Sequence, residues 1–214
     1  MAALTLTSLT HIHCGNYATA DAQLDEVVKL ASEKGALFWK VGGILVKGSL
    51  LAATGKASDA VLTITSELFE WHATGTTVWM PTYLSYLTRG HAELRQFDDA
   101  SRCIGEAMTM VQTTSESWYE AEVNRIAGEI ALLSPQRDAA KAEEHFERAL
   151  GIARRQQAKS WELRASMSLA RLWRDQGKVQ QARELLAPVY EWFTEGFDTR
   201  DLKEAKVLLD ELAT

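Results

Sequence analysis

Apolar side chains recur at helical spacing after five evenly spaced turns of the chain. Each turn is followed by an alanine, and intervals of 40, 40, 42 and 40 residues separate these alanines: Ala20, Ala60, Ala100, Ala142 and Ala182. An apolar residue stands four positions after each alanine: Leu24, Ile64, Ile104, Phe146 and Leu186. Seven positions after it, four copies are apolar again and Glu67 departs from the pattern. Offsets of four and seven trace one helical face, which we predict to be buried.

The residues before each alanine predict a tight turn and an earlier helix. Five residues before it, three copies have a glycine, which ends a helix cheaply in the left-handed conformation: Gly15, Gly55 and Gly177. The third copy has Arg95 there, and the fourth carries two extra residues and Pro135, which cannot continue a helix. Twelve residues before the alanine, allowing for the insertion, a small residue lets two helices approach closely: Ser8, Gly48, Thr88, Gly128 and Ala170. The chain is therefore predicted to be a series of helix pairs.

Self-similarity at a fixed period is typical of solenoid proteins. Periods of about 40 to 47 residues are usual for HEAT and armadillo repeats, and about 34 for tetratricopeptide repeats (TPRs). However, the small residue at position eight, a larger one at eleven such as Trp173, glycine at fifteen and alanine at twenty resemble the TPR signature. We predict an all-α, right-handed α-solenoid of about five TPR-like helix pairs with a period of about 40, in one domain covering residues 1–214. The predicted repeats are 1–35, 36–75, 76–115, 116–158 and 159–196.

A tryptophan recurs near the start of the first helix in copies two to five: Trp39, Trp79, Trp118 and Trp161. We expect these side chains to pack in the core as part of an extra turn. The alternative is that they line a pocket for a small-molecule effector.

The two ends of the series differ. After the fifth pair, Asp198 is a candidate N-cap for a C-terminal cap helix over 198–213, in which one face is charged. Its apolar residues are spaced by three and four: Leu202, Ala205, Leu209 and Leu212. The first helix, in LTLTSLTHIHCG, has no such cap, and its outward side would be exposed. We expect the chain either to be the C-terminal piece of a longer protein or to pair through this end.

Composition excludes several classes of protein. A formal net charge of -6 argues against nucleic-acid binding, which relies on a basic surface. The longest weakly charged run contains Lys47 and is too short and too rich in glycine to span a membrane. The two cysteines, Cys14 and Cys103, are far apart and form no CxxC motif, which favours a reducing compartment such as the cytoplasm.

The sequence also resembles a known group of proteins. The run AKSWELRASMSLARLWRDQGKVQQARELLAPVYEWFTEGFDTRDLKEAKVLLDEL, with EVNRIAGEIALLS and AEEHFERALGIARRQQA, resembles the C-terminal TPR region of bacterial multidomain signalling proteins. In that group a class III adenylate/guanylate cyclase domain and a signalling ATPase domain precede the repeats. The resemblance covers essentially the whole chain and is strongest from about Trp118 onward. It implies a regulatory array and not cyclase activity, because neither upstream domain has a counterpart here.

Two stretches have a weak likeness to chemical motifs. GSLLAATGKA has six residues between its glycines and Ala57 after Lys56, so it fails the Walker A pattern for phosphate binding. In HIHC, only His11 and Cys14 could share a helical face, and four convergent metal ligands are lacking. We therefore expect no cofactor and no metal site, and no local arrangement suggests nucleophilic catalysis.

The remaining candidate site is the concave face, which TPR arrays build from their first helices. The repeat register places Thr82, Ser85 and nine candidate ligand-binding residues there: Arg89, Glu93, Glu122, Arg125, Glu129, Arg164, Met167, Arg171 and Arg174. The last four share one stripe, so three guanidinium groups converge. Because arginine forks suit carboxylates, we expect the stripe to capture an acidic peptide segment or tail. The alternative is a solvated face with local pairs such as Arg125 with Glu129 and Arg171 with Asp175.

The sequence therefore predicts a non-catalytic protein-interaction or regulatory module. Its expected partner is a protein, an acidic peptide segment or an upstream domain of the same polypeptide. The alternatives are a self-associating or domain-docking scaffold, with a possible homodimer, and a small-molecule effector sensor.

Overall fold

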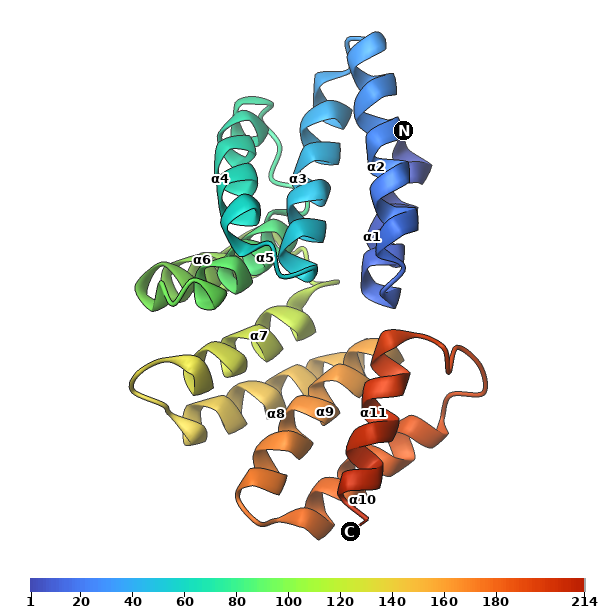
Figure 1. The fold of residues 1–214 in the computed structure, drawn as a ribbon. Helices are drawn as coiled ribbons and strands as arrows, with labels where there is room; N and C mark the ends of the chain where they lie inside the picture. Colours follow the sequence, from blue (N-terminus) through green and yellow to red (C-terminus); the bar gives the residue numbers. More distant parts are fainter. Residues whose placement is uncertain (214) are drawn as a thin grey trace. The chain divides into compact units, whose positions relative to one another are not determined.

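Eleven α-helices account for almost all of the chain in the computed structural model, which describes residues 1–213 (Figure 1). In chain order they are α1 (Ala2–Cys14), α2 (Tyr17–Glu33), α3 (Leu37–Ala53), α4 (Ala57–Ala73), α5 (Met80–Glu93), α6 (Phe97–Thr114), α7 (Glu120–Leu133), α8 (Ala139–Arg155), α9 (Lys159–Asp175), α10 (Val179–Glu191) and α11 (Arg200–Glu211). The first ten form five sequential antiparallel pairs, and α11 follows them. The predicted all-α, TPR-like helix-pair fold is confirmed.

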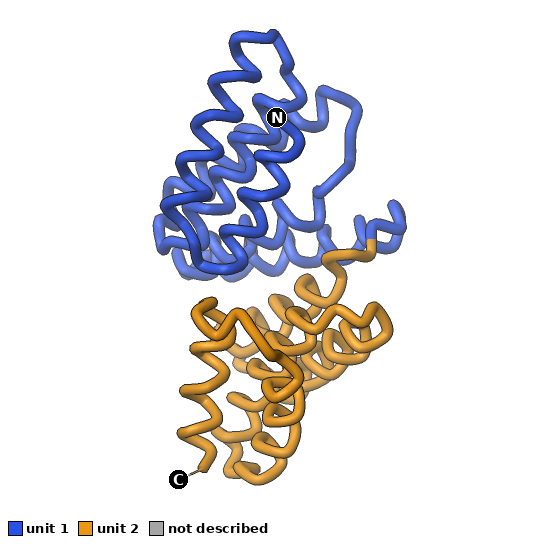
Figure 2. Tube along the Cα trace, turned by 90° about the vertical axis from the view of Figure 1, so that its right-hand side faces the viewer, with its two compact units in different colours: residues 1–116 blue, residues 117–214 orange. Residues whose placement is uncertain are grey.

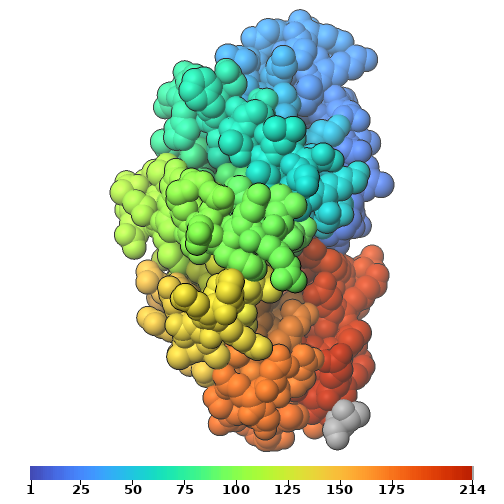
Figure 3. All heavy atoms as spheres, turned by 60° about the vertical axis from the view of Figure 1, so that its left-hand side comes forward, coloured from blue at the N-terminus to red at the C-terminus, as the bar shows by residue number. Residues whose placement is uncertain are grey.

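The helices group into two compact units, residues 1–116 and 117–214 (Figure 2). In unit 1, each first helix packs against its own second helix and against the next first helix, as α3 does with α4 and α5. Unit 2 repeats this arrangement with α7 to α10, and α11 packs on α9 and α10. In the space-filling view the residues of α11, in red, lie directly against orange residues of unit 2 (Figure 3). Helix α11 therefore takes the position of a further first helix in unit 2.

The alanines that set the repeat register lie at the centre of the pairs. All five are completely buried, and so is the apolar face that follows them, apart from slight exposure of Ile104 and Val189. The departure at Glu67 leaves a partly buried side chain on α4. The predicted seam of each second helix is thus confirmed by its burial.

The small residue of each first helix lies where the two helices of a pair come closest. A Cβ atom added to Gly48 would lie 2.6 Å from Cγ1 of Ile64, and one added to Gly128 would lie 2.4 Å from Cε1 of Phe146. Both distances are shorter than van der Waals contact. Gly48 and Gly128 therefore have to be glycine, because the side chains of Ile64 and Phe146 occupy the space that a Cβ atom would need.

In four of the five pairs the turn has the same backbone conformation whether or not it contains glycine. The fourth turn differs, because Ser134 follows α7 in an extended conformation and the amide of Asp138 donates to the Ala131 carbonyl. Gly177 has φ 78° and donates to the Arg174 carbonyl, while Lys178 donates to Trp173. Arg95 has φ 60°, and the bonds around it follow the same pattern. These bonds satisfy the carbonyls at the helix end, so the turn of the third pair matches those of the first, second and fifth pairs despite the strain of a non-glycine residue in the left-handed region.

Three sequence expectations need correction. Of the four recurring tryptophans, Trp39, Trp79 and Trp161 are only partly buried and Trp118 is exposed. The fully buried tryptophan is Trp71, whose ring centre lies 4.7 Å from that of Phe38 and 6.5 Å from that of Trp79. Helix α11 begins after Thr199 rather than at Asp198, and it ends at Glu211. Its buried face includes Leu208, while Leu209 is only partly buried.

Candidate binding site on the first helices

The nine candidate residues fall in both units. Arg89 and Glu93 are on α5 in unit 1, and the other seven are on α7 and α9 in unit 2. The candidate residues are therefore described unit by unit.

The candidate residues on α5 form no cluster of charged side chains. Thr82 and Ser85 are fully buried, and the Ser85 hydroxyl donates to the Pro81 carbonyl at 2.7 Å. The Arg89 guanidinium lies 5.9 Å from the centre of the Tyr86 ring, and Glu93 is exposed. Neither Arg89 nor Glu93 forms an ion pair with another residue in the part of the chain that the structure describes. These two side chains face solvent and do not form a cluster.

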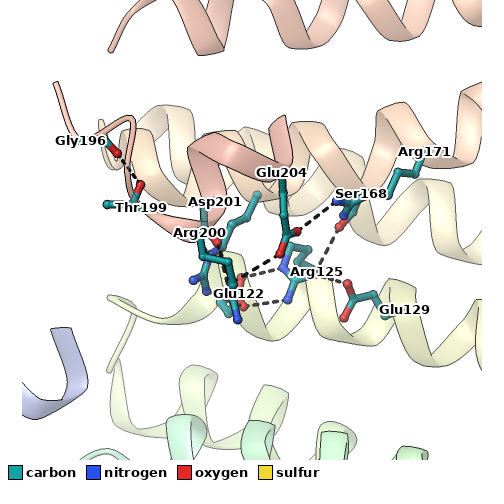
Figure 4. Close-up of polar contacts among 11 residues, drawn as sticks. Glu122, Arg125, Glu129, Ser168, Arg171, Gly196, Thr199, Arg200, Asp201 and Glu204 are labelled. Carbon is teal, nitrogen blue, oxygen red and sulfur yellow. Dashed lines mark hydrogen bonds and ion pairs between the residues drawn. The ribbon is translucent and has the colours of Figure 1, made fainter. Parts of the chain in front are cut away.

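On α7 the candidate residues form a buried ion network (Figure 4). Arg125 donates to both carboxylate oxygens of Glu122, from Nε at 2.7 Å and from Nη2 at 2.8 Å. Its Nη1 pairs with Glu129 and donates to the Ser168 hydroxyl at 3.2 Å. Burial disfavours the charged guanidinium, but Glu122 and Glu129 outweigh it and hold the pKa of Arg125 above its ordinary value.

Arg164 on α9 extends this network to α11. Its Nη1 donates to Glu122 at 3.2 Å, and its Nε donates to Asp201 of α11 at 2.5 Å. The guanidinium also lies 5.1 Å from the centre of the Trp161 ring. Burial lowers its pKa, but the carboxylates of Glu122 and Asp201 raise it more, so the net shift is upward. Glu122, Arg164 and Asp201 thus alternate in charge across α7, α9 and α11.

The remaining two arginines pair with α11 at the surface. Arg171 donates to Glu204 at 3.1 Å, with side chains 40% and 46% exposed. Arg174 pairs with Glu211 and also with Asp175 of its own helix, at 3.0 Å. The predicted local pair of Arg125 with Glu129 is present, but Arg171 pairs with Glu204 and not with Asp175.

Met167 has no part in this polar surface. It is 3% exposed and lies in the core of unit 2 with Leu163 of α9 and with Leu202 and Leu208 of α11. Helix α11 therefore covers the stripe in two ways, with leucines over Met167 and carboxylates beside the arginines. Helix α11, which the sequence predicted as a C-terminal cap, is therefore also the partner of the arginine stripe of α9.

The sequence analysis missed the three carboxylates of α11 as members of the site. Asp201, Glu204 and Glu211 are spaced by three and seven, so they share one helical stripe. This acidic stripe matches the basic one on α9 and was the signal that could have identified the pairing.

The site divides into a buried part and an exposed part. Breaking a buried pair leaves an uncompensated charge and costs about 3 to 5 kcal/mol, whereas an exposed pair contributes about 0 to 1 kcal/mol. Glu122, Arg125 and Arg164 are therefore structural in the resting chain. Arg171 and Arg174 are the arginines whose partners could be exchanged at small cost.

Residues 1–213 hold no group of three or more histidine, cysteine, aspartate or glutamate side chains placed to bind a metal ion. None of the helices described in this range combines the length and apolar character needed to cross a membrane.

Comparisons with known proteins support the fold. No model of a protein family matches the sequence, and no curated protein matches it. Among solved structures, the nearly identical TPR-like repeats of a Podosopora anserina protein of the kinesin-light-chain type resemble this chain, with 15% identity, a TM-score of 0.54 and coverage of 98% of this chain and 95% of theirs. A crystal structure of a point variant of these repeats gives 17% identity and a TM-score of 0.56, over 88% of this chain and 92% of the other. At this identity the likeness establishes a TPR-like repeat fold.

Proposed function

We propose that this chain is a non-catalytic protein-interaction module in which the arginine stripe of α9 binds an acidic helical segment. The observation that carries the proposal is the pairing of Arg171 and Arg174 with Glu204 and Glu211 of α11. Helix α11 is itself an amphipathic helix with an acidic stripe, so it serves as an internal example of the ligand. TPR-like folds are generally interaction scaffolds, which agrees with this function.

An external ligand does not have to displace the whole of α11. The leucines of α11 are buried in the core, but the side chains of Arg171 and Arg174 remain 40% and 34% exposed. A partner carboxylate can therefore replace Glu204 or Glu211 while the helix stays in place. Because α11 is tethered at high effective concentration, the ligand competes with it, and weakening the internal pairs should strengthen binding.

The test uses a fluorescent peptide with the sequence of residues 198–213 and the full chain. We expect weak binding to the wild-type chain, measured by fluorescence anisotropy. Replacing Glu204 and Glu211 by glutamine should tighten binding by about fivefold, because two internal pairs worth about 1 kcal/mol together no longer compete.

The matched variants separate the stripe from general electrostatics. R171E/R174E should abolish peptide binding. The control R148E/R183E makes the same change in net charge at exposed arginines of α8 and α10 and should bind like the wild type. Equal loss of peptide binding in R171E/R174E and R148E/R183E would overturn the proposal. Wild-type binding by R171E/R174E would overturn it as well.

We also propose a wider setting, in which the module is the regulatory TPR region of a cyclase/ATPase-type signalling protein. The resemblance noted above supports it, since its strongest part, from about Trp118 onward, is the sequence of unit 2. The acidic ligand would then come from an upstream domain of the same polypeptide or from a separate protein. Sequencing the transcript tests this setting, because it requires a cyclase or ATPase domain in the same reading frame.

A further inference from the structure

Helix α4 in unit 1 exposes a stripe of apolar and small residues. The stripe consists of Leu62, Ser66, Phe69 and Ala73, and we call these four residues the α4 stripe. Leu62 is 73% exposed and Phe69 is 76% exposed, which makes them the two most exposed large apolar side chains in residues 1–213. No other helix in this range carries two exposed large apolar side chains. The α4 stripe therefore takes no part in the packing of α4 on α3 and α5.

The repeat provides a comparison for this stripe within the chain. Leu62 and Phe69 stand two and nine positions after the register alanine Ala60. The equivalent residues of α2, α6, α8 and α10 include no large apolar side chain: Ala22 and Lys29; Arg102 and Thr109; Glu144 and Gly151; Glu184 and Glu191. The helix-pair fold thus does not require apolar side chains at these positions, and their presence on α4 indicates a contact outside the fold.

The spacing of the stripe fits a partner helix. Its members are separated by four, three and four residues, which is the spacing of the seam between two helices that pack side by side. Large side chains at Leu62 and Phe69 alternate with small ones at Ser66 and Ala73, which leave room for apolar side chains of a partner. The Ser66 hydroxyl donates to the Thr63 carbonyl at 3.0 Å, so covering the stripe leaves this donor paired.

Charge favours a basic partner. Of the eleven helices in residues 1–213, α4 is the only one that contains carboxylates but no lysine or arginine. Asp59 and Glu70 are exposed on one flank of the stripe, and neither forms an ion pair with another residue in this range. A second copy of the same helix would bring no lysine or arginine to these carboxylates. A partner helix with lysine or arginine along one flank would pair with both of them.

We propose that the α4 stripe binds an amphipathic helix of another protein, with apolar residues spaced by three and four and with lysine or arginine along one flank. Leu62 and Phe69 pack between the apolar side chains of this helix, and Asp59 and Glu70 pair with its cations. The surface belongs to unit 1, and its ligand has the opposite charge to the acidic segment proposed for the arginine stripe of α9. The two binding sites are therefore independent of each other.

The first test uses the full chain and a fluorescent synthetic helix of about 18 residues, with leucines spaced by three and four and lysines along one flank. Fluorescence anisotropy should show saturable binding to the wild-type chain. L62Q/F69Q should weaken binding at least about tenfold, because the apolar contact is lost. L133Q/V207Q is the matched control, since it replaces exposed apolar side chains of α7 and α11, and it should bind like the wild type.

A second pair of variants tests the charge. D59N/E70Q should weaken binding of the lysine peptide by about fivefold and make it less sensitive to salt. D98N/E106Q makes the same change in net charge at exposed carboxylates of α6 and should bind like the wild type. A peptide in which glutamate replaces every lysine should bind the wild-type chain at least about tenfold more weakly.

Several results would overturn the proposal. One is the absence of saturable binding of the lysine peptide to the wild-type chain, and another is wild-type binding by L62Q/F69Q or by D59N/E70Q. Equal binding of the lysine and glutamate peptides would overturn it as well. Sedimentation of the chain alone tests the other occupant, because a dimer that L62Q/F69Q dissociates would assign the α4 stripe to a second copy of the chain.

Discussion

The two units build the same helix-pair repeat around different buried polar groups. In residues 1–116 the buried polar side chains are hydroxyls and one imidazole: Thr5, Ser8, Ser49, Thr82, Ser85, Thr88 and His91. Unit 2 also buries neutral polar side chains, those of Asn124, Ser166 and Ser168, but it adds four charged ones on its first helices: Glu122, Arg125, Glu162 and Arg164. The repeat register even places Thr82, Glu122 and Arg164 at equivalent positions.

This difference determines how far each face depends on other helices. A buried hydroxyl can donate to a carbonyl of its own helix, as Ser49 does to Leu45 and Thr88 does to Leu84. A buried charge needs an opposite charge, and Arg164 finds its partners on α7 and α11. The first-helix face of unit 2 is therefore tied to α11, while hydroxyls of unit 1 such as those of Ser49 and Thr88 need only their own helix.

The largest expected effect on the free energy of unfolding comes from replacing Arg164 by an apolar residue, and the equivalent Thr82 of unit 1 provides the comparison. Arg164→Met should lower the free energy of unfolding by about 3 kcal/mol, because Glu122 and Asp201 lose a buried counter-charge. Thr82→Val in unit 1 should change it by less than about 1 kcal/mol, since the Thr82 hydroxyl oxygen has no hydrogen-bond partner within residues 1–213. Urea denaturation followed by circular dichroism measures both. Equal losses for the two variants would remove the contrast between the units.

A smaller effect on stability should arise at the small residue of the first helix, where the two helices of a pair come closest in both units. Gly128→Ala would place its Cβ 2.4 Å from the Phe146 ring and 3.0 Å from the Ala142 carbonyl oxygen, and should cost about 2 kcal/mol. Gly48→Ala in unit 1 should cost a similar amount against Ile64. Gly105→Ala is the control, because its Cβ would meet nothing within 4 Å, and it should stabilise the chain by about 0.5 to 1 kcal/mol. A neutral Gly128→Ala would contradict the packing described for the pairs.

The smallest expected effect is the pH dependence that Glu162 of unit 2 contributes. Burial raises the pKa of Glu162, but hydrogen bonds from Lys159 at 2.7 Å and Arg154 at 3.0 Å lower it more, so the net shift is downward. A lowered folded-state pKa adds stability above the unfolded value near 4.5, and this contribution is lost as the pH falls through the folded value. Glu162→Gln should therefore be less stable than the wild type by under about 1 kcal/mol at neutral pH, and the gap should close in acid. Melting curves over a pH series would show a constant gap if the account were wrong.

Most of the fold could be predicted from sequence because local repetition carries it. The register alanines, such as Ala60, and the small residues, such as Gly128, each pack within one pair, and the same offset recurs in every copy. The turn at Arg95 could be predicted from the repeat register alone, although this copy has no glycine at that position.

The site was less predictable because its pairing crosses elements that do not share the repeat offset. Sequence separations of 37 and 33 residues join Arg164 to Asp201 and Arg171 to Glu204, whereas the pairs repeat at 40 or 42. These separations depend on the connection between α10 and α11 and on how α11 lies on α9. Met167 was assigned to the stripe for the same reason, since the core that buries it includes residues of α11 as well as of α9 and α10.

The central claim is that the carboxylates of α11 satisfy the arginine stripe and hold this helix on unit 2. Hydrogen exchange of the α11 amides, followed by mass spectrometry in Arg164→Met and Asp201→Asn, tests it most directly. We expect exchange in residues 200–211 to accelerate about tenfold or more in either variant, which corresponds to about 1.4 kcal/mol, while α1 to α4 exchange as in the wild type. Unchanged protection of α11 in both variants would contradict the claim.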